Sequence, residues 1–334
     1  MQLIIKILSL VSTTLILTLY TFSSCTSKES KSTQARPTNT SEASAKTETS
    51  KGTFPLPTVP VIMTNPEDIM MYLSEHYWDL YDFSDISLIA QADITEQGLA
   101  NYIQLLNQLS FTDAEKSINT MLNKAKPHPA MYRHFASLYE FYLYEPNSPF
   151  RNDELYIPVV KHLSKSGVLS QDKQELYAFH LTMVQKNRVA TTASNFAYTL
   201  ANGDKKMMHN LQSNYLILFF TNPDCPGCAS TTDQIVNSLP LQDIFSLNTS
   251  TNKQLTVLSI YPDANIDEWR KALPSLPQQH WVNGYDDGEV IYNNLVYDIK
   301  AIPTLYLLDK DKKVILKDVS LGEIEEYFME LSKE

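Results

Sequence analysis

The residues best placed to do chemistry are two cysteines, Cys225 and Cys228, with two residues between them. They follow the apolar run 215–220, which predicts a buried strand, and they precede helical spacing of apolar residues in 229–239. This order predicts that Cys225 is the N-cap of a helix and that Cys228 is its third residue. Unpaired N–H groups and the positive helix end would stabilise a thiolate on Cys225, which could attack a disulfide. Cys228 could then resolve the mixed disulfide.

A pair of cysteines at this spacing can also be half of a zinc site or a structural disulfide. The chain has one further cysteine, Cys25, and His280 has no partner at close spacing in the sequence. We therefore expect neither a metal nor another cofactor. Pro226 donates no N–H group and Gly227 is conformationally permissive, so these two residues are expected to influence the reduction potential of the cysteine pair.

The composition indicates an acidic, well-packed protein that is long enough for two compact domains. The chain has 334 residues, 43% of them hydrophobic, and a formal net charge of −11. Sequence-independent binding of nucleic acid requires clustered Lys and Arg to neutralise phosphates, and the charge balance argues against it. We expect no nucleic-acid partner.

The first 24 residues have the pattern of an export signal. One cation, Lys6, precedes the uncharged stretch 7–24, which ends in small residues before Cys25. Residues 22–25, Phe-Ser-Ser-Cys, resemble a bacterial lipobox, which implies cleavage before Cys25 and attachment of lipid to it. A retained transmembrane helix is the alternative, but the Ser and Thr content makes the stretch only moderately apolar.

Residues 25–60 are predicted to be a disordered tether. Between 26 and 52 there are twelve Ser or Thr and no Val, Ile, Leu, Met or aromatic residue, so this stretch cannot contribute to a core. Acyl chains on Cys25 would hold the folded part close to a membrane.

Residues 61–189 are predicted to form an all-helical domain. Asn65 is expected to cap a helix that begins at Pro66, and the sequence Thr-Asp-Ala-Glu at 112–115 is typical of a capping box. Helical spacing predicts helices over 66–80, near 95–109, from 112, and over 129–144, 153–165 and 171–186.

This domain is rich in aromatic residues, which gather in 77–83 and in 132–144. Their helical spacing favours core residues over the alternative, an open groove for a sugar or peptide. His180 lies on an apolar helix face and has no second ligand at metal-binding spacing, so we expect a core histidine rather than a ligand.

Strand patterns begin near residue 190. Asn202-Gly203 is typical of a two-residue β-hairpin between 195–201 and 205–208. Apolar patterns then predict strands over 215–220, 255–261, 305–308 and 313–316, and helices over 229–239, 267–272, 289–296 and 321–331. The expected fold class is α+β with two domains, the helical domain and an α/β domain over 190–334.

A second motif, Ala301-Ile302-Pro303-Thr304, leads into the apolar run 305–308. Further matching stretches are 194–196, 218–220 and 296–304. With these motifs residues 190–334 resemble the thioredoxin superfamily, in particular its exported, membrane-tethered branch that includes TlpA and ResA. The resemblance implies that Pro303 is cis and packs beside the cysteines. It also implies that Ile302 and Thr304 position an extended substrate by strand-like pairing.

Three positions depart from the family pattern. Asp224 precedes the first cysteine, where tryptophan is common, and Phe219 and Thr231 stand where relatives carry acidic residues. The carboxylate of Asp224 would oppose a thiolate on Cys225, and proton transfer could use water or Asp224. The helical part resembles, more weakly, an uncharacterised module that precedes thioredoxin domains in some Gram-negative lipoproteins.

The leading hypothesis is a lipid-anchored thiol-disulfide oxidoreductase of a Gram-negative cell envelope, facing the periplasm or the cell surface. Its expected partners are protein thiols or disulfides, an upstream redox donor, and the membrane through Cys25. Reduction is favoured by the resemblance alone, and a net oxidant or isomerase would use the same residues. The alternative from another class is a tethered binding or scaffold protein in which the cysteine pair is inert.

Overall fold

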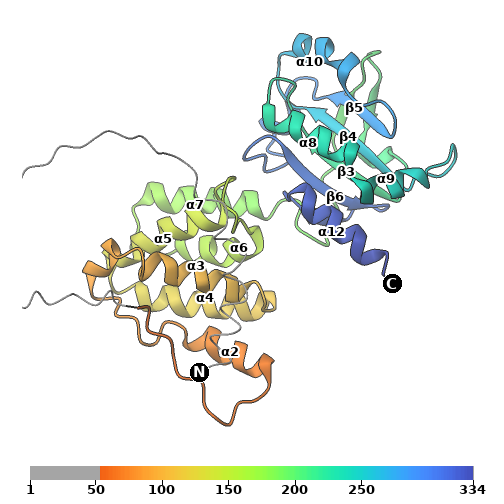
Figure 1. The fold of residues 1–334 in the computed structure, drawn as a ribbon. Coiled ribbons are helices and arrows are strands. Elements are labelled where there is room, and N and C mark those ends of the chain that lie inside the picture. The colour runs from red at the N-terminus through yellow and green to blue at the C-terminus, as the bar shows by residue number, and fades with distance from the viewer. Residues whose placement is uncertain (1–52, 334) are drawn as a thin grey trace, which may run out of the picture. The chain divides into compact units, whose positions relative to one another are not determined.

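The computed structural model describes residues 53–333 (Figure 1). The predicted export signal, the lipid site at Cys25 and most of the predicted tether lie outside these residues. The described residues form one compact unit, in which a helical region, 53–189, precedes a sheet region, 190–333. The helical and α/β characters of the two regions are confirmed, whereas a division into two separate domains is not. No helix within 53–333 is long and apolar enough to cross a membrane.

The helical region contains six α-helices and a short 3-10 helix among the residues described. Their bounds are α2 (Pro66–His76), η1 (Ile86–Ala90), α3 (Thr95–Leu106), α4 (Phe111–Ala125), α5 (Pro129–Leu143), α6 (Asp153–Leu163) and α7 (Gln171–Val184). The predicted cap of α2 is confirmed, because the side chain of Asn65 accepts a hydrogen bond of 2.9 Å from the N–H group of Glu67. This bond satisfies one of the free donors at the helix start.

Helix α4 begins earlier than the predicted capping box at 112–115. Its N-cap is Ser110, whose hydroxyl accepts a hydrogen bond of 3.2 Å from the N–H group of Asp113. The prediction of a cap at Thr112 is therefore wrong. Ser110 satisfies the N–H group of the third helical residue, as the predicted box would have done two residues later, and the apolar Phe111 is the first helical residue.

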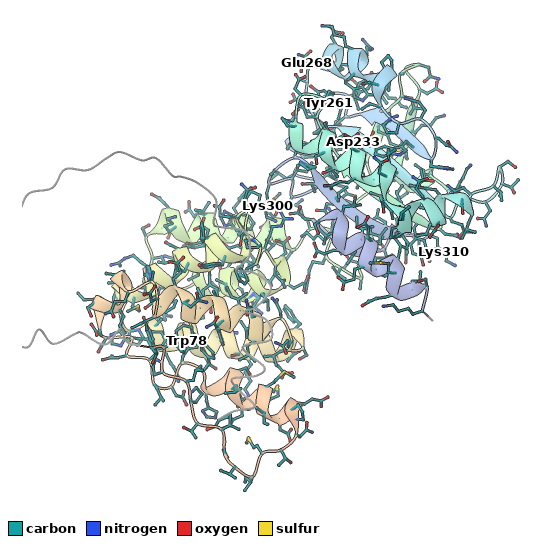
Figure 2. All side chains as sticks on the ribbon, viewed as in Figure 1. Trp78, Asp233, Tyr261, Glu268, Lys300 and Lys310 are labelled. Carbon is teal, nitrogen blue, oxygen red and sulfur yellow. The ribbon has the colours of Figure 1, made fainter. Side chains whose placement is uncertain are left out.

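Large aromatic side chains fill the interior of the helical region. Tyr132 and Tyr139 have no exposed surface, and Trp78, which is labelled in Figure 2, packs edge-on against several neighbouring rings. His180 is buried too. The core role predicted for most of these residues is confirmed, although Phe141, in the second aromatic group, is 56% exposed.

The packed part of the chain begins before the predicted end of the tether at residue 60. Phe54 stacks on Tyr77 with 4.8 Å between ring centroids, and it contacts the rings of Trp78 and Tyr81 as well. Its ring lies directly over Gly98 of α3, where an added Cβ atom would come within 2.4 Å of Cδ2. Glycine at position 98 therefore makes room for Phe54.

The sheet region is built on a seven-stranded mixed sheet of order β2-β1-β5-β4-β3-β6-β7. Its strands are β1 (Ala197–Thr199), β2 (Lys205–Met207), β3 (Tyr215–Phe220), β4 (Leu255–Tyr261), β5 (Trp281–Tyr285), β6 (Thr304–Asp309) and β7 (Val314–Lys317). Its helices are η2 (Met208–Asn210), α8 (Pro226–Asn237), α9 (Leu239–Ser246), α10 (Ile266–Ala272), η3 (Leu273–Ser275), α11 (Val290–Asn293) and α12 (Leu321–Leu331). Strand β3 lies between β4, which is parallel to it, and β6, which is antiparallel.

Alternate residues of β3 enter two separate cores, which explains its continuous apolar sequence. Ile217 and Phe219 pack beneath α8, α9 and α12, which cover one face of the sheet (Figure 1). Leu216, Leu218 and Phe220 pack on the opposite face with the hairpin of β1 and β2, with α11 and with the chain that precedes β6.

One strand and one α-helix of the sheet region had no counterpart in the sequence prediction. Strand β5 contains Asn283 and Gly284, which are poor strand formers, and glycine is required at 284 because the ring of Tyr198 lies where a Cβ atom would be. Helix α9 begins immediately after α8, with Ser238 as its cap. Pro240, which favours the end of a helix, is instead tolerated in the first turn of α9.

The two edges of the sheet differ. At one edge β1 and β2 form the predicted hairpin, and Gly203 in its turn has φ +87°, a left-handed conformation that glycine adopts readily. At the other edge the chain that arrives from the helical region pairs with β7. The N–H groups of Ala190 and Ala193 donate to carbonyl groups of the hairpin formed by β6 and β7 at 2.8 Å. The N–H group of Val314 donates to the carbonyl of Thr191 at 2.9 Å.

The contact between Phe54 and Gly98 predicts a stability effect that changes sign with the background. Gly98→Ala improves helix propensity by up to about 1 kcal/mol, but the new methyl group collides with the Phe54 ring. We expect this substitution to lower the free energy of unfolding by about 1 kcal/mol in the natural sequence and to raise it by about 0.5 kcal/mol beside Phe54→Ala.

Urea unfolding of the natural chain, the two single variants and the double variant would measure both effects. A change of the same sign and size in both backgrounds would show that Phe54 does not pack on α3.

Candidate active site

The order of the sheet brings two loops together. Strands β3 and β6 are antiparallel neighbours in which Phe220 is opposite Thr304. The chain that leaves β3 after Phe220 and the chain that enters β6 at Thr304 therefore meet at the same end of these two strands. The first loop carries the two cysteines and the second carries Pro303.

The predicted positions of the cysteines are confirmed. Cys225 is the N-cap of α8, and the N–H group of Cys228, the third helical residue, donates to Cys225 Sγ at 3.2 Å. Both cysteines are free thiols, and Cys225 is partly exposed whereas Cys228 is only 1% exposed. One sulfur is therefore accessible to another molecule, and the second lies beneath it.

Burial affects the acidity of the inner thiol as well as its access. Burial, and next the hydrogen bond with Cys225, raise the pKa of the Cys228 thiol, and hydrogen bonds from the Asn222 backbone and the Thr221 side chain oppose this rise only partly. A buried thiol is harder to ionise because the thiolate loses its hydration. Cys228 therefore stays protonated at neutral pH in this state of the protein.

Asn222 shapes the loop before Cys225, and the sequence analysis assigned it no role. Its side-chain oxygen accepts from the N–H group of Asp224 at 2.9 Å, its backbone oxygen accepts from Cys225 at 3.1 Å, and its amide donates to Asp263 at 2.6 Å. The sequence Asn-Pro-Asp favours such a turn, in which an asparagine side chain bonds the backbone two residues on. This pattern could have identified Asn222.

The second loop lies against the first. The peptide bond between Ile302 and Pro303 is cis, as the family resemblance implied. The carbonyl oxygen of Ile302 is 3.5 Å from Cys225 Sγ and accepts a hydrogen bond from its thiol. A Cβ atom at Gly227 would come within 3.3 Å of Pro303 Cδ, so glycine there permits the close approach of Pro303 to the start of α8.

The remaining predicted residues surround this centre. Asp224, Pro226 and Gly227 are exposed beside Cys225. Thr304 is buried, and its hydroxyl donates to the carbonyl of Ala301 at 2.6 Å, which closes the turn before β6. The role of Thr304 in positioning a substrate stays a prediction, and its buried side chain leaves only its backbone for that role.

The three departures from the family pattern have clear positions. Phe219 is fully buried in the core beneath α8, and Thr231 is partly exposed on that helix. Asp224 is exposed. Within residues 53–333 no group of three or more His, Cys, Asp or Glu side chains could hold a metal ion. His280 stacks on Phe245 with 4.9 Å between ring centroids.

Comparison with known proteins separates the two parts of the chain. Residues 24–187 match a family described as a domain of unknown function, DUF5106. No curated protein matches the chain. Two partial likenesses are to the C-terminal domain of an uncharacterized protein from Bacteroides fragilis and to a domain of a possible thiol-disulfide isomerase from Cytophaga hutchinsonii. The first is 43% identical with a TM-score of 0.40, covering 43% of this chain and 98% of that one. The second is 23% identical with a TM-score of 0.35, covering 45% and 96%.

A crystal structure of a thioredoxin-like protein from Bacteroides caccae matches far more of the chain. It is 40% identical, has a TM-score of 0.78, and the match covers 83% of this chain and 98% of that one. Neither the helical region nor the sheet region alone makes up half of the chain, so the match includes both. Together with the cysteines at the start of α8 and the cis-proline beside them, this similarity shows that the chain belongs to the thioredoxin-like proteins.

Proposed function

We propose that the chain is a thiol-disulfide oxidoreductase that exchanges disulfides of exported proteins through Cys225 and Cys228. The observation that carries the proposal is the placement of one accessible sulfur at a helix N-cap, directly above a buried second sulfur and against the Ile302–Pro303 peptide. Such a placement supports a thiolate on the outer cysteine and reserves the inner one for resolution.

In the proposed reaction the Cys225 thiolate attacks one sulfur of a client disulfide. The client S–S bond breaks, its other sulfur leaves as a thiolate and takes a proton, and a mixed disulfide with Cys225 forms. Cys228 then loses its proton and attacks Cys225, which releases the second client thiolate and leaves a disulfide between Cys225 and Cys228. The client gains two electrons, and the enzyme regains them from a dithiol donor.

The same residues could run this reaction in reverse. The direction depends on the potential of the cysteine pair relative to the donor and the client. We propose net reduction, in keeping with the resemblance to TlpA and ResA. Pro226 and Gly227 between the sulfurs, and Asp224 beside them, are the residues expected to tune that potential.

The substrate-binding role that we propose for the second loop follows from its backbone. The Ile302 carbonyl already accepts a bond from Cys225, and the loop is partly exposed at residues 301–303. An extended client segment beside Cys225 could pair with this backbone, as strands pair at a sheet edge.

Cys228→Ser should trap the first step. Without the resolving sulfur, the mixed disulfide on Cys225 has no internal route to release. A reduced full-length variant mixed with a peptide that contains one disulfide should accumulate a covalent adduct, visible as added mass under non-reducing conditions.

Cys225→Ser is the matched control and should form no adduct, while the chain with both Cys225 and Cys228 should release the reduced peptide. All three proteins carry Cys25→Ser, so that Cys25 cannot form an adduct of its own. If Cys228→Ser forms no adduct while remaining folded, the chain is a scaffold with an inert cysteine pair rather than an enzyme.

The raised pKa of Cys228 predicts how this thiol reacts as the pH changes. In a chain with Cys25→Ser and Cys225→Ser, the rate of alkylation of Cys228 should rise about tenfold per pH unit without levelling below about pH 10, because only the thiolate reacts and burial disfavours it.

Glutathione alkylated in parallel serves as the exposed control, and its rate should level off near the ordinary thiol range of about pH 8.5–9. Poor access lowers the whole curve but does not move its plateau. A plateau for Cys228 at or below that of glutathione would contradict the raised pKa.

We also propose that Cys25 is lipidated after removal of residues 1–24, which tethers the enzyme to a membrane of a Gram-negative envelope. The support is the order Phe-Ser-Ser-Cys after an uncharged stretch.

In cells fed labelled palmitate the chain should carry label and sediment with membranes. Cys25→Ser should abolish both properties and Cys225→Ser neither. Label that persists in Cys25→Ser would reject this site.

A further inference from the structure

The loop that carries the cis-proline has no regular secondary structure between α11 and β6, yet it is held at several points. The side chain of Tyr297 is buried in the sheet core among aromatic rings. The amide of Asn187, which follows α7, donates to the Val296 carbonyl at 3.0 Å. The next two contacts of this loop are made by charged residues, Asp298 and Lys300, that are almost entirely buried.

Lys300 is the centre of a buried group of charges that joins the helical region to the sheet region. Its side chain is 5% exposed, and its ammonium nitrogen lies 3.0 Å from Asp153 Oδ1, at the first residue of α6, and 3.1 Å from Asp298 Oδ2. A third carboxylate, of Asp318, is 3.7 Å away, and the ring of Tyr144 lies 4.7 Å from the nitrogen. Figure 2 labels Lys300 where the two regions meet.

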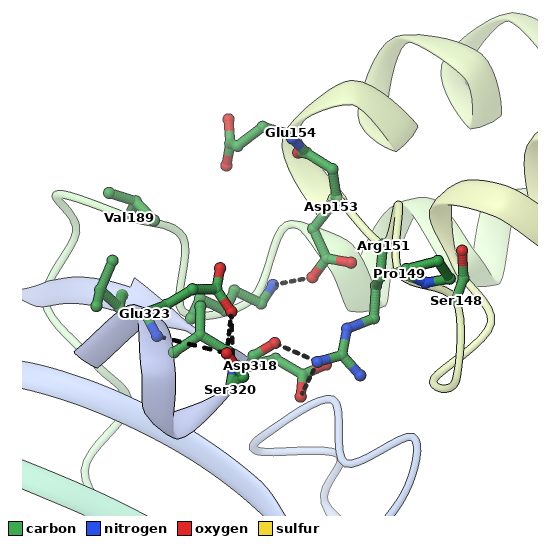
Figure 3. A pocket seen from close by; sticks show the side chains of 13 residues that line it. Ser148, Pro149, Arg151, Asp153, Glu154, Val189, Asp318, Ser320 and Glu323 are labelled. Carbon is green, nitrogen blue, oxygen red and sulfur yellow. Dashed lines mark hydrogen bonds and ion pairs between the residues drawn. The ribbon is translucent and has the colours of Figure 1, made fainter. Parts of the chain in front are cut away.

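Two further cations complete this group. Lys317 lies 2.8 Å from Asp153 Oδ2 and donates to the carbonyl groups of Val184 and Lys186, at the end of α7, at 2.8 Å each. Arg151 pairs with Asp318 at 3.3 Å, as Figure 3 shows. We call the six residues the anchor cluster: Arg151, Asp153, Asp298, Lys300, Lys317 and Asp318.

The anchor cluster contains three carboxylates and three cations, so its charges balance. It lies at the wall of a cavity of about 540 Å³ that Arg151, Asp153, Lys317 and Asp318 help to line. Buried charges are tolerated only where each has an opposite partner in good geometry, and removal of one partner leaves another unpaired. Burial alone would lower the pKa of Lys300, but Asp153, Asp298 and Asp318 raise it, so the ammonium stays charged.

The need for an opposite charge beside each buried charge restricts where Lys300 can lie. Only Ala301 separates it from Ile302, and the backbone spans at most about 3.5 Å per residue, so a shift of Lys300 is transmitted to the Ile302 carbonyl. The opposite end of the segment is already fixed, because Thr304 is paired with Phe220 in the sheet.

We propose that Lys300 is a positioning residue for the redox site, and that Asp153 of the helical region holds it so that Ile302 and Pro303 stay against Cys225 in the arrangement that receives an extended client. The helical region thereby contributes to client binding without touching the client. This inference rests on the proposed function for its kinetic consequence, but the placement of the loop can be measured independently.

Asp153→Asn in the full chain tests the proposal. Asparagine keeps an oxygen that can accept from Lys300 but removes the charge. The matched control is Glu154→Gln, the next residue of α6, whose partner Arg188 lies outside the anchor cluster and whose pair is about one-third exposed. Lys300→Met is the complementary variant, and Asp153→Asn decides the question if Lys300→Met does not fold.

Two kinetic measurements, the KM for a peptide disulfide and the rate of alkylation of Cys225, separate positioning from a general loss of structure. We expect Asp153→Asn to raise the KM for a peptide disulfide by about tenfold, because misplacement of the loop weakens binding of an extended substrate. Alkylation of Cys225 by iodoacetamide, which needs no loop, should change by less than about twofold. Glu154→Gln should leave both unchanged. An unchanged KM in folded Asp153→Asn, beside an active natural chain, overturns the inference.

Backbone NMR relaxation provides the readout that needs no activity. Order parameters of the amide groups of residues 299–302 should be lower in Asp153→Asn than in the natural chain, while those of β3 stay unchanged. If the natural chain fails to exchange disulfides, the proposed function fails, and this measurement alone decides whether the anchor cluster positions the loop. Equal order parameters at 299–302 in the two proteins would reject the positioning role.

Discussion

Strands β3 and β6 run antiparallel with Phe220 opposite Thr304, and this register determines where the chemistry can occur. Because the two strands pair, the loop that presents Cys225 and the loop that presents Pro303 leave the sheet at the same point. A slip of one residue would turn every apolar side chain of β3 to the wrong core, so the two cores hold the register firmly. The position of the candidate active site is therefore a consequence of packing far beneath it.

The two loops are stabilised in different ways. The first is short, and local hydrogen bonds from Asn222 and the start of α8 organise it. The second is longer and irregular, and it depends on residues distant in the sequence, above all Asp153, which is 147 positions away from Lys300. The second loop is partly exposed beside Cys225 and cannot be buried under its own side chains, so its support comes from the neighbouring helical region.

Sequence patterns predicted those features that depend on neighbouring residues. The apolar run of β3, the turn at Asn202-Gly203, the cap position of Cys225 and the bounds of α12 all follow from local periodicity or turn chemistry, and the cis state of Pro303 followed from family resemblance. β5 and α9 were not predicted because local residues favour other structures: Gly284 is a poor strand former, and Pro240 favours the end of a helix rather than its start. Phe54 on Gly98 and Lys300 with Asp153 join distant residues, and no local pattern reports such pairs.

The connection between the two regions also closes one side of the sheet. By pairing with the β7 hairpin, residues 190–193 occupy hydrogen-bonding groups that would otherwise be open to a strand of another molecule. The opposite border is β2, which has three residues, two of them the lysines Lys205 and Lys206. A short border that carries charged side chains discourages intermolecular strand pairing, so neither side of the sheet offers a long open strand to another molecule, and aggregation through the sheet is disfavoured.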